Sequence, residues 1–184
     1  MRIISGKYKG RHIELPDNIR ARPTTDFARE GLFDILSNRV DFEKIEVLDL
    51  FSGTGSISFE FVSRGTRMVH LVESDRYNIS FIRKNIKTLK IENIKPLRLD
   101  VRNFLRICKH KYDIVFADPP YDLPWLRELP DMVLKSNILT EEGFLIIEHP
   151  GGVRFFDHPF FFEHRKYGRV NFSFFRKPAM AIRE

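Results

Sequence analysis

The stretch VLDLFSGTGS, residues 47–56, decides the fold of this chain. Its first half, Val47 to Leu50, is apolar enough for a buried strand, and a helical pattern follows from Ser56. Between them, Gly53 and Gly55 favour a tight turn, because glycine adopts backbone angles that other residues avoid. A strand, a glycine turn and a helix in this order form an α/β unit whose turn can approach a ligand closely.

The same alternation of strands and helices continues along the chain. We expect strands at 45–51, 68–73, 95–99, 112–117 and 143–148, and helices at 55–64, 75–90, 101–109 and 123–135. Such an order predicts a mostly parallel sheet that is covered on both faces. Two aromatic segments, 160–166 and 170–177, flank a turn at 167–169. They predict an antiparallel hairpin at the sheet edge, with its phenylalanines mainly in the core.

The first residues have a different character. Two short strand-like pieces, 2–4 and 12–15, lie on either side of Gly6 and Gly10 and predict a small hairpin or flap. A helix then starts near residues 23–26, with a threonine or Asp26 as its cap. We therefore divide the chain into an N-terminal β-hairpin extension, residues 1–22, and one α/β domain, residues 23–184.

The charges are unevenly distributed along the chain, whose formal net charge is +6. Residues 1–22 have six basic and two acidic side chains, and residues 151–184 have seven basic and three acidic ones. Each end therefore has a net charge of +4, and the middle has −2. Basic ends around a near-neutral centre predict a polyanionic ligand that is bound outside the central fold. Ordinary surface solvation is the alternative.

Composition also limits where the protein works. Hydrophobic residues make up 42% of the 184 residues, but no apolar stretch approaches the roughly 18–20 residues of a membrane helix. No long apolar region follows the first charged residues, so we expect no secretory signal. The single cysteine, Cys108, has no partner for a disulfide or a metal site. We expect a monomeric cytoplasmic protein without a metal or a membrane.

The glycine turn has the surroundings of a nucleoside site. Glu73 ends the next expected strand, where a carboxylate can bind both hydroxyls of a ribose. Asp100 ends the third expected strand, where its side chain or the Val101 backbone can contact an adenine edge. A dinucleotide site usually has a third glycine, at the position of Ser58 here. S-adenosylmethionine therefore fits better than NAD. The alternative is a tight turn and a surface glutamate.

A second set of residues, Asp118 to Tyr121 (DPPY), follows the expected strand 112–117. The two prolines make the turn rigid, which fixes the direction of the Asp118 carboxylate and of the Pro119 carbonyl. Both groups can accept hydrogen bonds from the exocyclic amine of a base, and Tyr121 can stack on a base that is flipped out. The geometry would suit an in-line methyl transfer. The alternative is a proline strand terminator with a solvated aspartate.

These motifs resemble a known family. The pattern Asp49-x-Phe51-x-Gly53-x-Gly55 followed by DPPY is similar to class I methyltransferases that act on exocyclic amines. The start MRIISG, then RPTTD at 22–26 and Arg29-Glu30-x-Leu32-Phe33, resembles the bacterial 16S rRNA guanine-N2 methyltransferases. The resemblance implies a Rossmann-like seven-stranded sheet, S-adenosylmethionine as methyl donor, and one guanine of 16S rRNA as substrate, in a small ribosomal subunit or an assembly intermediate.

The resemblance also assigns roles to individual residues. Asp118, Pro119, Pro120 and Tyr121 would hold the guanine. The cofactor would contact Asp49, Phe51, Ser52, Gly53, Thr54, Gly55, Glu73, Asp100 and Val101. Arg22, Thr24, Thr25 and Arg29 match the N-terminal signature and are candidate substrate-binding residues, and Lys7, Lys9 and Arg11 are candidate phosphate contacts.

Three rival functions remain open at this point. A DNA or RNA adenine-N6 methyltransferase would share the DPPY turn, but the DNA enzymes usually carry a further recognition domain, for which 184 residues leave no room. A nicotinamide-dependent oxidoreductase would need the missing third glycine. A non-catalytic RNA-binding assembly factor would not need an intact Asp118 and Glu73.

Overall fold

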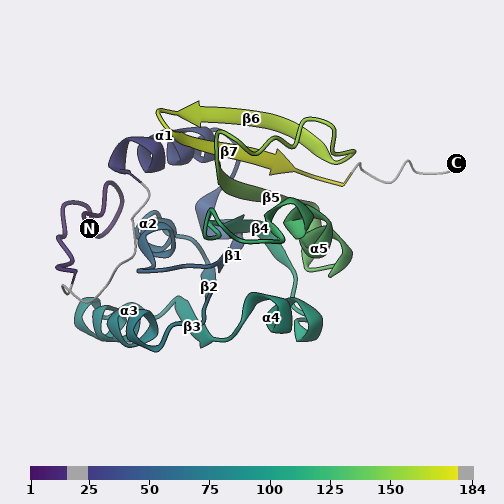
Figure 1. Cartoon of the computed structure of the whole chain (residues 1–184). Coiled ribbons are helices and arrows are strands. Elements are labelled where there is room, and N and C mark those ends of the chain that lie inside the picture. The colour runs from purple at the N-terminus through teal and green to yellow at the C-terminus, as the bar shows by residue number, and fades with distance from the viewer. Residues whose placement is uncertain (16–24, 178–184) are drawn as a thin grey trace, which may run out of the picture.

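A computed structural model describes residues 1–15 and 25–177. Over these ranges, seven strands form one sheet in the order β3-β2-β1-β4-β5-β7-β6 (Figure 1). The first five strands are parallel, and β7 is antiparallel to both β5 and β6. The sheet and its C-terminal hairpin are confirmed. The strands are β1 (Glu46–Leu50), β2 (Met68–Glu73), β3 (Ile94–Arg98), β4 (Tyr112–Ala117), β5 (Leu139–Pro150), β6 (Phe161–Tyr167) and β7 (Val170–Phe175).

The helices also follow the predicted order, with one late start. They are α1 (Asp26–Ser37), α2 (Ser56–Ser63), α3 (Arg76–Leu89), α4 (Val101–Ile107) and α5 (Leu129–Lys135), with short 3-10 turns η1 (Phe42–Lys44) and η2 (Leu126–Glu128). The helix predicted at 123–135 begins only at Leu129. Pro130 lies in its first turn, where a missing N–H is tolerated, so the chain before it forms η2 instead.

Two buried layers cover the sheet. One contains apolar residues of α1, α2 and α3, and the other contains those of α4 and α5. Neighbouring strand residues point to opposite faces, so Val47 packs in the first layer and Leu48 in the second. The phenylalanines of β7, Phe172, Phe174 and Phe175, are completely buried, as the sequence predicted. Among the described residues, no helix is both long and apolar enough to span a bilayer.

The N-terminal segment is attached to α2 by hydrogen bonds. The buried Glu60 carboxylate accepts from the backbone N–H groups of Ile4, at 2.8 Å, and Ser5, at 3.1 Å. The Ser63 carbonyl accepts from the Lys7 N–H at 2.6 Å. In place of two predicted strands, the segment pairs with itself through one antiparallel bridge, between Arg2 and His12.

Gly6 allows this close approach, and its replacement is expected to loosen the segment. A Cβ atom at Gly6 would lie 1.8 Å from the Ser63 carbonyl oxygen, whereas one at Gly10 would meet nothing within 4 Å. Both glycines have similar positive φ angles, 80° and 78°, so both alanine variants carry the same backbone strain. We expect Gly6→Ala to lower the free energy of unfolding by about 2 kcal/mol more than Gly10→Ala. Urea unfolding measures this difference, and equal losses would contradict it.

Candidate active site

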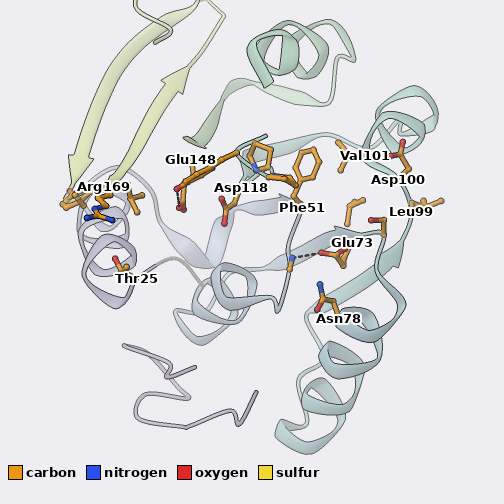
Figure 2. Close-up of a pocket in the computed structure, with 18 of the residues that line it drawn as sticks. Thr25, Phe51, Glu73, Asn78, Leu99, Asp100, Val101, Asp118, Glu148 and Arg169 are labelled. Carbon is orange, nitrogen blue, oxygen red and sulfur yellow. Dashed lines mark hydrogen bonds between the residues drawn. The ribbon is translucent and has the colours of Figure 1, made fainter. Parts of the chain in front are cut away.

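A cavity opens at the carboxyl ends of β1 and β4. The chain runs outward from β1 to β2 and β3, then returns to β4 and β5 on the other side of β1. Ligands of open α/β sheets bind at such a reversal of strand order. The cavity has a volume of about 810 Å³, within the usual range for small-molecule sites. Figure 2 shows its lining residues converging from β1, β2, β4 and β5 and from the β6–β7 turn.

The glycine turn forms one wall. Phe51, directly after β1, has a φ of 59°, which is uncommon for a non-glycine residue and typical of functional sites. Gly53 and Gly55 also have positive φ angles, and Gly55 is the N-cap of α2. Phe51 and Gly53 line the cavity, whereas the predicted cofactor residues Ser52, Thr54 and Gly55 do not.

Glu73 lies where the sequence placed it, at the end of β2 and in the cavity wall. Its two carboxylate oxygens accept from the backbone N–H groups of Gly53 and Asp75, each at 2.8 Å (Figure 2 draws the first). A carboxylate has about four acceptor positions, so two remain for a ligand. The bonds also connect the glycine turn to the end of β2.

Asp100 and Val101 line the cavity beside Leu99 and Val72. The Asp100 carboxylate caps α4 and accepts from the Asn103 N–H at 3.1 Å. This bond fixes the start of α4 and with it the position of the Val101 backbone. The apolar side chains Val72, Leu99 and Val101 make this end of the cavity suitable for a flat ring.

Asp49 lies beneath the cavity and does not line it. Only 1% of its surface is exposed, and its carboxylate accepts from the Ser58 hydroxyl at 2.6 Å. Burial raises the pKa of Asp49 to about 7, and the nearby Glu73 adds a smaller increase. Ser58 occupies the third-glycine position of a dinucleotide motif, and here its hydroxyl is the hydrogen-bond partner that Asp49 needs.

This shifted pKa predicts a stability that depends on pH. The unfolded Asp49 loses its proton near pH 4, whereas the folded one holds it to about pH 7. Over this range the folded state binds more protons, so Asp49 destabilises the fold progressively as the pH rises. Asp49→Asn keeps an acceptor for Ser58 and cannot ionise. We expect its stability relative to wild type to increase by about 3 kcal/mol between pH 4 and pH 8 in urea unfolding. A constant difference would contradict the assignment.

Asp118 to Tyr121 form the opposite wall. Asp118 follows β4, and its N–H donates to the Leu50 carbonyl at 3.3 Å, which holds the turn beside β1. All four residues line the cavity. Desolvation raises the pKa of Asp118 well above its ordinary value, and the charges of Glu148 and Asp49 raise this pKa further. The turn that was predicted to hold the base is therefore part of the cavity wall.

Several cavity residues were missed. Glu148, at the C-terminal half of β5, is 97% buried and accepts from the Tyr121 hydroxyl at 3.4 Å. It ends the expected strand 143–148, so the rule that selected Glu73 applied equally to Glu148. Asn78 of α3 and Arg169 of the β6–β7 turn also face the cavity (Figure 2). No local pattern places that turn relative to the other strands, so the sequence contains no signal for Arg169.

The N-terminal candidates are only partly brought to the cavity. Thr25 lines it and also caps α1, where it accepts from the Ala28 N–H at 3.2 Å. Arg29 is buried away from it, and its guanidinium donates to the Arg2 carbonyl and to Asp26. Lys7, Lys9 and Arg11 are exposed on the N-terminal segment and do not line the cavity. Arg22 and Thr24 lie outside the described residues.

Within residues 1–15 and 25–177, no group of three or more His, Cys, Asp or Glu side chains is arranged to bind a metal ion.

Comparisons with known proteins agree with this architecture. Residues 1–176 match the family described as "Conserved hypothetical protein 95". Ribosomal RNA small subunit methyltransferase D of Buchnera aphidicola subsp. Baizongia pistaciae (strain Bp) is 34% identical, over 80% of this chain and 75% of that protein. The protein of the same name from Escherichia coli (strain K12) is 33% identical, over 80% and 74%.

A solved structure gives the same result for the fold. It is titled "Putative methyltransferase yhhF from Escherichia coli", has a TM-score of 0.85 and 28% identity, and the match covers 98% of this chain and 99% of that one. Sheet order, cavity position and sequence similarity all agree. The chain therefore belongs to the conserved hypothetical protein 95 family, that of the ribosomal RNA small subunit methyltransferase D proteins, and has the fold of a class I methyltransferase.

Proposed function

We propose that the protein transfers a methyl group from S-adenosylmethionine to the exocyclic N2 of one guanine in 16S rRNA. One observation carries the proposal: a single cavity joins Glu73, at the end of β2, to Asp118–Tyr121, at the end of β4. A nucleoside cofactor held by the first can present its reactive end to a base held by the second.

The cavity residues fit S-adenosylmethionine. The two remaining acceptor positions of Glu73 suit the ribose hydroxyls, and Val72, Leu99 and Val101 suit the adenine ring. Four acidic residues, Glu73, Asp100, Asp118 and Glu148, line the described cavity against one basic residue, Arg169. This charge opposes a pyrophosphate, which argues against NAD. When bound, the cofactor supplies an electrophilic methyl group.

Asp118 activates the amine in this proposal. An exocyclic amine is a poor nucleophile, because its lone pair is delocalised into the ring. Acceptance of its two hydrogens by the Asp118 carboxylate and the Pro119 carbonyl localises that pair on N2. Tyr121, with 44% of its surface exposed, is available to stack on the flipped base. The raised pKa of Asp118 suits it to take the proton that N2 loses after transfer.

The RNA assignment rests on charge and on the relatives. The chain has a net charge of +6, and the exposed Lys7, Lys9 and Arg11 are suited to contact phosphates. Relatives of the chain are named as small-subunit ribosomal RNA methyltransferases. A small ribosomal subunit, or an intermediate of its assembly in the cytoplasm, is the substrate that we propose, and a monomer suffices to bind it.

Mass spectrometry of nucleosides tests the proposal. The protein is incubated with isotope-labelled S-adenosylmethionine and small ribosomal subunits that lack the modification, and the RNA is then digested. We expect labelled N2-methylguanosine, mapped to one guanine. Labelled N6-methyladenosine would retain the mechanism and overturn the target base. Absence of label, in subunits and in free 16S rRNA, would overturn the proposed substrate.

A further inference from the structure

Two carboxylates lie side by side where the target base would bind. Ala117 of β4 pairs with Ile147 of β5, so Asp118 and Glu148 are the next residues on two adjacent parallel strands. Adjacent strands lie roughly 4.8 Å apart. Phe116 and Ile146 pack in the layer of α1–α3, and side chains alternate, so both carboxylates point to this same face. Figure 2 shows them facing the cavity together.

Glu148 is held in this position from two directions. The Tyr121 hydroxyl donates to its Oε1 at 3.4 Å, and β7 pairs with β5 at the Glu148–Phe172 position. Only 3% of Glu148 is exposed, and its charge raises the pKa of the neighbouring Asp118. Two buried carboxylates in proximity are unfavourable to the fold, which points to a role in binding.

The Watson–Crick edges of purines differ in one feature that such a pair can detect. Guanine presents two adjacent donors, N2–H and N1–H, whereas adenine presents its N6 amine beside N1, which is an acceptor. If Asp118 accepts from the amine, a second carboxylate beside it accepts from N1–H of guanine. The same carboxylate would repel the N1 lone pair of adenine.

We propose that Glu148 accepts a hydrogen bond from N1–H of the target guanine and thereby makes the site selective for guanine over adenine. This inference rests on the proposed function, because it requires Asp118 to hold the exocyclic amine. Glu148 is thus a specificity-determining residue, and Tyr121 both stacks on the base and fixes the carboxylate that reads its edge.

The test uses 2-aminopurine at the target position, in subunits reconstituted with the substituted RNA. This base keeps the N2 amine but has a lone pair at N1. We expect wild type to prefer guanine by about 100-fold in kcat/KM, because 2-aminopurine leaves a buried carboxylate facing an acceptor. In Glu148→Gln, the side-chain amide can donate to N1, so we expect the preference to fall at least about tenfold.

Glu141→Gln is the matched control, since Glu141 is exposed on the same strand and far from the cavity lining. Its preference should equal that of wild type. An unchanged preference in Glu148→Gln, with slower transfer to both bases, would overturn the inference and leave Glu148 as a support for Tyr121. Equal rates of wild type on both bases would overturn it without any variant. Failure of wild type to methylate guanine would instead overturn the proposed function.

Discussion

Replacement of Asp118 by alanine is expected to abolish methyl transfer while cofactor affinity stays nearly unchanged. The variant loses the acceptor that localises the amine lone pair and the base that takes the N2 proton. Loss of one preorganised electrostatic group at a reacting centre typically costs about 10²–10³ in rate, and here one residue has both roles. We therefore expect kcat to fall by about 10³ or more, measured in single-turnover transfer to small subunits.

A control variant and a stability measurement test the role of Asp118 further. Asp122→Ala removes an exposed carboxylate four positions along the same loop and should leave the rate unchanged. Asp118→Ala should also unfold at a higher temperature than wild type near pH 8. The raised pKa of Asp118 means that its ionised form destabilises the fold at that pH. Strong loss of S-adenosylmethionine binding in Asp118→Ala would instead move this residue into the cofactor site.

Glu73→Ala is expected to have the second largest effect, this time on cofactor binding. The variant removes the proposed ribose ligand and leaves the N–H groups of Gly53 and Asp75 without their acceptors. Each buried N–H group that loses its acceptor costs about 1–3 kcal/mol of folding free energy. The hydrogen bonds from Glu73 to the ligand are lost as well. We expect the Kd for S-adenosylmethionine to rise at least about 100-fold in isothermal titration calorimetry.

The exposed Glu92 gives a control of the same chemistry, since Glu92→Ala should bind the cofactor as wild type does. Glu73→Ala should still bind RNA, because the phosphate contacts that we propose lie on the N-terminal segment. Wild-type cofactor affinity in Glu73→Ala would show that this carboxylate only ties the glycine turn to β2, and the ribose would need another partner.

Most of the fold could be predicted from local sequence patterns. Short apolar runs and the glycine turn located β1, β2 and β4 to within about one residue, because a strand buried on both faces leaves an unbroken apolar run. The start of α5 was placed too early, since the apolar spacing from residue 123 is compatible with a helix until the effect of Pro130 is included. The N-terminal segment does fold back on itself, but through one antiparallel bridge rather than two strands, and it is also held by hydrogen bonds to α2, a partner that is remote in sequence.

The candidate site could be predicted from local sequence patterns only in part. Glu73 and Asp118 were predicted because Glu73 ends a strand and Asp118 directly follows one, both at the ligand-binding edge of the sheet. Asp49 also lies in a strand, but its place beneath the cavity depends on Ser58, whose hydroxyl comes from the following helix. Arg169 could not be predicted, because the strand order β5-β7-β6 brings the β6–β7 turn to the cavity, and no local sequence pattern indicates that order.

The strand order β5-β7-β6 also determines when the cavity can form during synthesis of the chain. The β6–β7 turn forms part of the cavity wall, and β7 lies between β5 and β6 in the sheet. The cavity whose first wall residues follow β1 is therefore complete only when β7, the last described strand, is in place. A nascent chain that ends after β5 has Glu73, Asp118 and Glu148 but lacks the turn and the strand that covers β5. The emerging protein is therefore expected to acquire ligand affinity abruptly, only once residues near 175 have left the ribosome.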